Sequence, residues 1–208
     1  MIRRVAYASC YVYSPAGTGE ICERSRLLCA RLKAGDARYI LKYAMRVHQQ
    51  TLESSPLAGF FCSTDVFVPV PRSVQGSGGT WVAADLSHAL VQEGLGAMTW
   101  PGLRRTSAVR KSATAAPGAR PSVALHYASF SIDCPPLIPT GVVLIDDVIT
   151  RGRTLLAAAS RVREAFPGIK VRAFALVRTM GQLPGVKTLL DPCTGEIRWC
   201  GGDAQRFP

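Results

Sequence analysis

Residues 142–154 read VVLIDDVITRGRT, and this stretch decides the fold. The unbroken apolar run 142–145 is typical of a strand that is buried on both faces of a sheet. Two adjacent carboxylates, Asp146 and Asp147, follow at the expected end of this strand, and a short polar loop then leads into a helix-prone run. Open α/β sheets bind ligands at the carboxyl ends of their parallel strands. The stretch therefore predicts an α/β protein with a ligand site at this point.

The polar loop, residues 150–154, has the features of a phosphate site. It enters an expected helix N-terminus, where free N–H groups and the positive end of the helix dipole attract anions. The neighbouring acids suit hydroxyl groups, so the ligand should carry both hydroxyls and phosphate, as a phosphorylated sugar does. An ordinary strand–loop–helix turn with a capping aspartate accounts for only one of the two acids.

The same thirteen residues resemble, position for position, the signature of type I phosphoribosyltransferases, enzymes that use phosphoribosyl pyrophosphate (PRPP). That pattern is four apolar residues, two acids, two apolar residues and a loop of small residues around a glycine. The resemblance implies that Asp146 and Asp147 are catalytic, hold the ribose hydroxyls, and bind Mg²⁺ through these hydroxyls or water. It also implies that the 5′-phosphate is bound by Thr150, Arg151, Gly152, Arg153 and Thr154.

A second segment, VPVPRS at residues 68–73, is similar to the diphosphate-binding strand and loop of that family, particularly in its competence-associated (ComF-type) branch. Glycines after this segment would let the backbone approach a diphosphate closely, and arginine offers charge-assisted hydrogen bonds. The resemblance implies that pyrophosphate is bound by Pro71, Arg72, Ser73 and Arg104. This chain departs from the branch in two respects, because it lacks the cysteine-pair zinc module and the glutamine of the basic loop.

The net charge of +11 is large for 208 residues and fits either nucleic acid or a polyanionic small molecule. Its placement favours a local anion site, because no acid lies between Glu93 and Asp133 while five cations do: Arg104, Arg105, Arg110, Lys111 and Arg120. Small residues, prolines and cations in 105–122 predict a long mobile loop, which in compact domains is usually functional. We expect Arg105 and Lys111 to assist catalysis from this loop.

The whole chain, 1–208, is predicted to form one domain with a type I phosphoribosyltransferase fold, in which helices flank a mostly parallel central sheet. Its expected parts are an N-terminal strand and helices in 1–58, a PRPP-binding core in 59–180, and a C-terminal tail in 181–208. The first helices and the tail are candidates for a small hood over the site. Hydrophobic periodicity and turn residues predict strands at 5–13, 66–71, 98–100, 142–145 and 171–177, and helices at 20–33, 36–52, 82–93 and about 155–166. A hairpin around Thr194-Gly195 is expected in the tail.

Other features narrow the class of protein. The chain has no apolar run near the ~20 residues of a membrane span and no secretory signal, so we expect a cytoplasmic protein that does not enter membranes. Its seven cysteines form no C-x-x-C pair, which predicts reduced thiols. There is no Walker-type phosphate loop. The histidines have no metal-binding spacing, although His126, beside the basic loop, is a minor candidate for substrate contact.

The sequence thus predicts a pentosyltransferase that transfers the 5-phosphoribosyl group from PRPP–Mg²⁺ to a nitrogen of a nucleobase-like molecule, with release of pyrophosphate. Homodimerisation, which is common in the family, is a further implication of the resemblance. Two alternatives stay open. One is a non-catalytic regulator that senses PRPP or nucleotides in the same pocket. The other is a competence-like protein whose basic face binds single-stranded nucleic acid, although few aromatic residues lie among the loop cations to stack bases.

Overall fold

The computed structural model describes residues 1–73, 79–109, 120–135, 139–181 and 186–208. The strands of its central sheet are β1 (Arg4–Tyr13), β2 (Val66–Pro69), β3 (Met98–Thr99), β6 (Gly141–Ile149), β7 (Lys170–Thr179), β8 (Leu190–Cys200) and β9 (Asp203–Phe207). In the described residues these seven strands follow the order β3-β2-β6-β7-β1-β8-β9. Strands β3 to β1 in this order are parallel, while β8 and β9 continue the sheet in antiparallel fashion. The predicted α/β fold with a mostly parallel sheet is confirmed.

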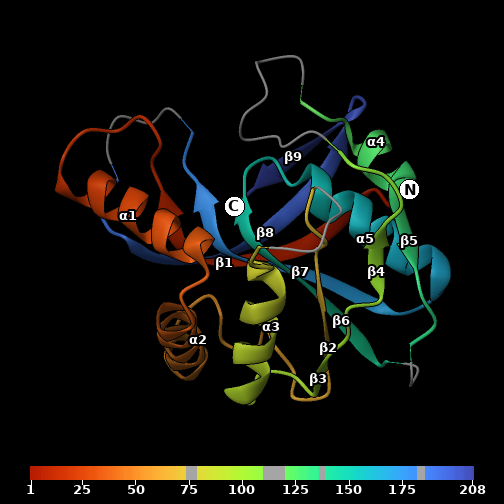
Figure 1. Cartoon of the computed structure of the whole chain (residues 1–208), viewed down its shortest axis with the longest axis horizontal. Coiled ribbons are helices and arrows are strands. Elements are labelled where there is room, and N and C mark those ends of the chain that lie inside the picture. Colours follow the sequence, from red (N-terminus) through yellow and green to blue (C-terminus); the bar gives the residue numbers. More distant parts are fainter. Residues whose placement is uncertain (74–78, 110–119, 136–138, 182–185) are drawn as a thin grey trace.

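Helices cover both faces of the sheet (Figure 1). One face carries α1 (Glu20–Ala34), α2 (Ala37–Leu52) and α3 (Val82–Gln92), and the other carries α4 (Val123–Ala128), α5 (Arg153–Ala165) and the two-stranded hairpin of β4 (Leu103–Arg105) and β5 (Phe130–Ile132). The apolar run of β6 supplies both cores, because successive strand residues point to opposite faces. Val142 and Leu144 join one core, and Val143 and Ile145 join the other.

The strand order reverses between β2 and β6. The crossover from β2 through α3 reaches β3 on one side, whereas the crossover from β6 through α5 reaches β7 on the other side. Because parallel crossovers are right-handed, opposite directions place α3 and α5 on opposite faces of the sheet, as observed. The segments that leave the carboxyl ends of β2 and β6 therefore lead to helices on opposite faces, which is the arrangement at which doubly wound proteins bind ligands.

The predicted helices form where their caps and apolar periodicity place them. The Asp36 side chain accepts the Arg38 backbone N–H at 3.0 Å and caps α2, while Gly35, at φ 69°, ends α1. Ile40, Ala44 and Val47 are buried, as their spacing predicts. The expected and observed ends of α1, α2 and α3 agree to within one residue.

The tail differs from the prediction. Strand β8 runs straight through Thr194-Gly195, so the predicted turn there is wrong, and the hairpin turns instead at Gly201-Gly202, with φ values of 55° and 91°. Gly195 lies opposite Tyr7 of β1, and a Cβ atom at Gly195 would collide with the backbone of Phe207 and Pro208 at the end of β9 and would lie 2.9 Å from the Tyr7 ring. This glycine therefore permits a close approach within the sheet. The tail strands β8 and β9 extend the central sheet beyond β1 in antiparallel fashion.

The sequence also gave expectations about the state of the cysteines and about membrane-spanning segments. The seven cysteines all lie in described segments, and each is a free thiol. Across the described ranges, the helices are too short or too polar to cross a lipid bilayer.

Candidate functional site at the strand switch point

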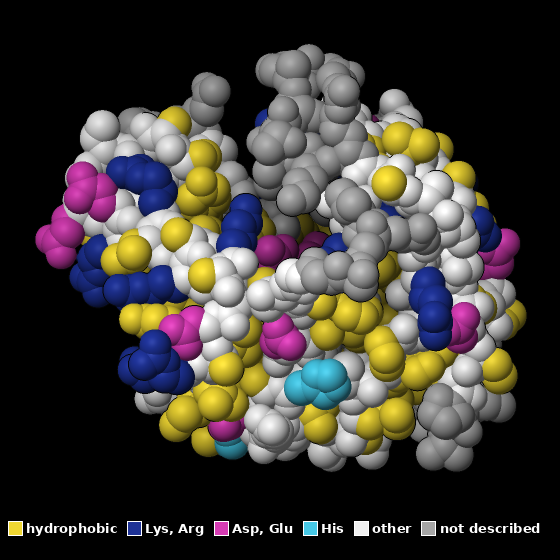
Figure 2. Space-filling model, in the orientation of Figure 1, with side chains coloured by type: hydrophobic (Ala, Val, Ile, Leu, Met, Phe, Trp, Pro, Cys, Tyr) yellow, Lys and Arg dark blue, Asp and Glu magenta, His cyan; other side chains and the backbone are white. Residues whose placement is uncertain are grey.

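Asp146 and Asp147 lie in the last part of β6, at the crevice. The sequence predicted that the strand ends before them, but β6 continues to Ile149 because it pairs with β7 that far, whereas its pairing with β2 ends at Ile145. The Asp146 carboxylate accepts the Asp147 backbone N–H at 2.9 Å, and the Asp147 carboxylate accepts the Val148 N–H at 2.7 Å. Both side chains are half-buried. In Figure 2, acidic side chains lie at the base of a hollow in the surface.

The electrostatics of the pair favour a bound cation or hydroxyl donors. Burial raises the pKa of Asp146 well above its usual range, the charge of Asp147 raises it further, and the charge of Arg105 opposes this. Two adjacent carboxylates that are partly shielded from solvent repel each other. A ligand that donates hydrogen bonds or brings positive charge relieves that repulsion.

The predicted phosphate loop follows β6 and starts α5. Thr150 and Arg151 are exposed, and Gly152 adopts a left-handed conformation at φ 84°. A Cβ atom at Gly152 would lie 2.7 Å from Ile197 of β8, so glycine is needed both for its backbone conformation and for its close approach. Gly152 carries no side-chain cap for α5. Because Gly152 has no side chain, it cannot cap the N–H groups of the first helical turn. These N–H groups therefore suit an anion.

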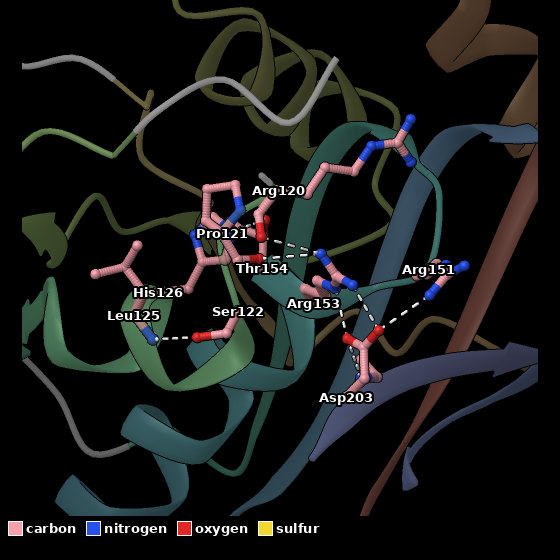
Figure 3. Close-up of polar contacts among 10 residues, drawn as sticks. Arg120, Pro121, Ser122, Leu125, His126, Arg151, Arg153, Thr154 and Asp203 are labelled. Atoms are coloured by element: carbon pink, nitrogen blue, oxygen red, sulfur yellow. Dashed lines mark hydrogen bonds and ion pairs between the residues drawn. The ribbon is translucent and has the colours of Figure 1, made fainter. Parts of the chain in front are cut away.

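The two arginines of this loop converge on Asp203, at the start of β9 (Figure 3). Arg151 NH1 lies 3.0 Å from Asp203 Oδ2, and Arg153 donates to both Asp203 oxygens at 2.5 Å. Hydrogen bonds from Arg153 are the largest cause that lowers the pKa of Asp203 to about 2. In addition, Arg206 Nε donates to the Thr150 carbonyl at 3.1 Å. The C-terminal hairpin therefore holds the phosphate loop in place.

The predicted diphosphate segment, Pro71 to Ser73, leaves the end of β2 at the same crevice. Its three residues are half-buried, and Arg72 NH1 donates to the Gly79 carbonyl at 2.7 Å. The Val109 N–H donates to the Ser73 carbonyl at 2.9 Å and so ties this segment to the end of the β4 region. The glycines Gly76 and Gly78 lie outside the described residues.

Arg105 links this segment to the acid pair. Its Nε donates to the Arg72 carbonyl at 2.9 Å, its NH1 donates to Ser129 Oγ at 2.6 Å, and its guanidinium stacks on the Phe130 ring at 4.4 Å. The residue is only 7% exposed, and burial lowers its pKa to about 10 while the charge of Asp146 raises it. Arg105 is therefore a buried cation close to Asp146, and the prediction that it belongs to a mobile loop is wrong.

The reason for this error is long-range pairing. Leu103–Arg105 forms a strand because it pairs with Phe130–Ile132, a segment about 25 residues away that no local pattern identifies as its partner. Alternation along β4 places Arg104 on the opposite side from Arg105, where its Nε lies 2.5 Å from Asp133 Oδ2. The structure thus does not bring Arg104 to Arg72. Lys111 lies outside the described residues.

His126 of α4 lies behind the phosphate loop. It is 3% exposed, with Nδ1 3.3 Å from Arg105 NH2 and Nε2 3.5 Å from Thr154 Oγ1. Burial, assisted by the charges of Arg105 and Arg153, lowers its pKa to about 4. The predicted substrate contact does not fit a ring enclosed by protein groups. The sequence contained no sign that His126 contacts Arg105 or that Asp203 pairs with Arg153. The partners in each of these pairs are far apart in the chain.

No model of a known protein family matches this chain, and its comparison with curated proteins gives no significant match. The fold and the site themselves define a class: a doubly wound α/β protein in which carboxylates, a phosphate-type loop and a buried arginine meet at the strand switch point. Within the described ranges, no group of three or more His, Cys, Asp and Glu residues could hold a metal ion.

Proposed function

We propose that this chain is a type I phosphoribosyltransferase, which binds PRPP with Mg²⁺ and transfers the 5-phosphoribosyl group to a nitrogen of a nucleobase-like molecule, releasing pyrophosphate. One observation carries the proposal: the acid pair lies between two loops suited to anions, one entering α5 and one leaving β2. A matching ligand has a diol in its middle and an anionic group at each end. PRPP has this order, with a 5′-phosphate, the ribose hydroxyls and a 1-diphosphate.

The roles of the residues follow from their positions. Asp146 and Asp147 would accept hydrogen bonds from the ribose hydroxyls and orient the sugar. The first-turn N–H groups of α5 and the hydroxyls of Thr150 and Thr154 would donate to the 5′-phosphate. The loop arginines act on the phosphate through their charge, because their guanidiniums are already paired with Asp203.

In the reaction, the acceptor nitrogen would form a bond to the ribose C1 as the bond from C1 to the diphosphate oxygen breaks. Positive charge develops on the ribose ring and negative charge builds on the departing diphosphate. Arg105 and Arg72 supply positive charge on the diphosphate side, and preorganised charge of this kind is usually a large part of catalysis. The carboxylates hold the substrate and are not assigned a proton transfer.

The acid pair also fits Mg²⁺. This ion is usually bound by one or two carboxylates together with substrate phosphates and water, and Asp146 and Asp147 supply two carboxylates. Burial, followed by the charge of Asp147, raises the pKa of Asp146, and a cation bound at the two carboxylates would offset both effects. When bound, the metal would neutralise charge on the diphosphate leaving group.

The test is calorimetric titration of PRPP with Mg²⁺ into the wild type and Asp147→Asn. The variant keeps the side-chain shape but removes its charge, and we expect its affinity for PRPP to fall at least about tenfold, the loss of one charge-assisted contact. Glu164→Gln, an equal change of charge at the far end of α5, is the control and should leave the affinity unchanged. Unchanged affinity in Asp147→Asn, or no binding by the wild type, overturns the proposal. Binding without pyrophosphate release across a panel of bases would favour the non-catalytic sensor.

A second candidate function is binding of single-stranded nucleic acid, and the outer face of α1 and α2 favours it. Lysine and arginine side chains gather there in Figure 2. The exposed cations are Arg24, Arg31, Lys33, Arg38, Lys42 and Arg46. Arg31 lies 4.6 Å and Lys42 5.9 Å from the ring centre of Tyr39, so cations and an aromatic ring share one surface. Such surfaces bind phosphates in a strongly salt-dependent way and can stack bases.

This candidate is tested by fluorescence anisotropy with a labelled oligothymidylate at 50 and 200 mM salt. Binding that weakens steeply with salt, and that is reduced by Lys42→Glu, supports it. A lack of binding at the lower salt concentration rejects it.

A further inference from the structure

The imidazole of His126 contacts the phosphate loop directly and reaches the diphosphate segment through Arg105 of β4. Its Nε2 lies 3.5 Å from the hydroxyl oxygen of Thr154, in the phosphate loop (Figure 3). Its Nδ1 lies 3.3 Å from Arg105 NH2, and Arg105 holds the Arg72 carbonyl in the diphosphate segment. The ring is almost fully buried, so its two nitrogens must find their partners within the protein.

The contact with Arg105 determines which nitrogen carries the proton. A guanidinium has hydrogen-bond donors and no acceptor, so Nδ1 of His126 must be the acceptor. The neutral ring then carries its proton on Nε2, and this N–H points at the Thr154 oxygen. Burial and the neighbouring arginine charges keep the ring neutral at physiological pH, because they lower its pKa to about 4.

We propose that His126 is a positioning residue that makes the Thr154 hydroxyl a dedicated hydrogen-bond donor to the 5′-phosphate of the ligand. This inference rests on the proposed function. The Thr154 oxygen receives an N–H from His126, so its own proton is left to donate to the anion. The bonds run in one direction, from Arg105 to His126, from His126 to Thr154, and from Thr154 to the phosphate. Hydrogen bonds aligned in this way polarise and strengthen one another.

The opposite tautomer would reverse the effect. With the proton on Nδ1, the Thr154 hydroxyl would donate to Nε2 and present lone pairs to the phosphate, which repel it. The tautomer of a buried ring, set by an arginine from a different strand, therefore decides whether the phosphate loop offers a donor or an acceptor at this position.

The binding test compares two probes, ribose 5-phosphate and inorganic pyrophosphate, in calorimetry on the full chain. His126→Phe removes the N–H, and we expect the affinity for ribose 5-phosphate to fall about tenfold or more, as for a lost hydrogen bond to a charged group, while the affinity for pyrophosphate changes less than about threefold. In a Thr154→Val background the same substitution should have almost no further effect, because the hydroxyl that it positions is gone. His126→Gln can keep an N–H near the Nε2 position and should retain most of the affinity.

Two results would overturn the role of His126 without touching the proposed function. One is an equal loss of affinity for both probes in His126→Phe and His126→Gln, which indicates a purely structural residue. The other is an additive loss in the Thr154→Val background. If the wild type binds neither probe, the proposed function fails and the role of His126 fails with it.

An independent readout is the tautomer itself. Nitrogen NMR of histidine-labelled protein, assigned by comparison with His126→Gln, should show a neutral ring protonated on Nε2 between pH 5 and 8. A proton on Nδ1 rejects the inference whatever the ligand affinities are.

Discussion

Asp203→Asn tests how strongly the C-terminal hairpin holds the phosphate loop. The substitution preserves the size of the side chain and removes the charge that pairs with Arg151 and Arg153. Lowering the pKa of Asp203 from 3.8 to about 2 corresponds to about 2 kcal/mol of stability at neutral pH. Because the Asp203 side chain is 31% exposed, solvent screening reduces this figure, and we expect the substitution to cost about 1 kcal/mol.

The sign of the pH dependence follows from the direction of the shift. The pKa of Asp203 is lower in the folded protein than in the unfolded chain, so its contribution is complete above about pH 4 and is lost as the pH falls toward 2. The difference in free energy of unfolding between wild type and Asp203→Asn should therefore shrink to about half at pH 3.

Urea unfolding at pH 7 and pH 3 measures both effects. The matched control is Glu196→Gln on the adjacent strand β8, because that side chain is also 31% exposed and pairs with arginines that are largely in solvent. It should cost no more than about 0.5 kcal/mol. The reasoning is refuted if Asp203→Asn costs no more than the control at pH 7, or if its cost is the same at pH 3.

Two further substitutions test other parts of the fold by urea unfolding. Gly152→Ala should destabilise the protein by about 2–4 kcal/mol, because φ is 84° and Ile197 blocks the new methyl group. The control Gly168→Ala, where φ is 86° and the space around the new methyl group is open, should cost only about 1–2 kcal/mol. Equal costs for the two substitutions would contradict this account. Asp65→Leu should cost about 3–5 kcal/mol, because it leaves the buried Arg172 guanidinium, 2.6 Å from both Asp65 oxygens, without its counter-charge. Adding Arg172→Met should recover much of this loss, and a double variant as unstable as the single one would argue against an ion-pair origin.

Local sequence could predict the elements whose signals lie within the element itself. The apolar run 142–145, the Asp36 cap and the spacing of Ile40, Ala44 and Val47 predicted β6 and α2 because each signal lies within the element that it specifies. The acid pair and the phosphate loop were predicted as neighbours for the same reason. They are adjacent in the chain, and the end of a parallel strand keeps them together.

Glycine misled the prediction at a position where its role depends on segments that are distant in the chain. Thr194-Gly195 has the composition of a turn, yet Gly195 lies within β8, where the lack of a side chain allows close approach of the Phe207–Pro208 backbone and of Tyr7. The turn falls at Gly201-Gly202, whose positive φ values require glycine. A glycine that permits a turn and a glycine that permits close packing look alike in sequence.

The sequence by itself determined the α/β class, the apolar strands, the ends of α1, α2 and α3, and the adjacency of the acid pair and its loop. Only the tertiary structure decided the partners of these groups: Arg105 buried between Arg72 and His126, and Asp203 paired with Arg153 from 50 residues away. The physical reason is that periodicity and capping act within a few residues along the chain. A buried charge or imidazole, in contrast, takes its partner from whichever distant segment the packing of the sheet and its helices brings against it.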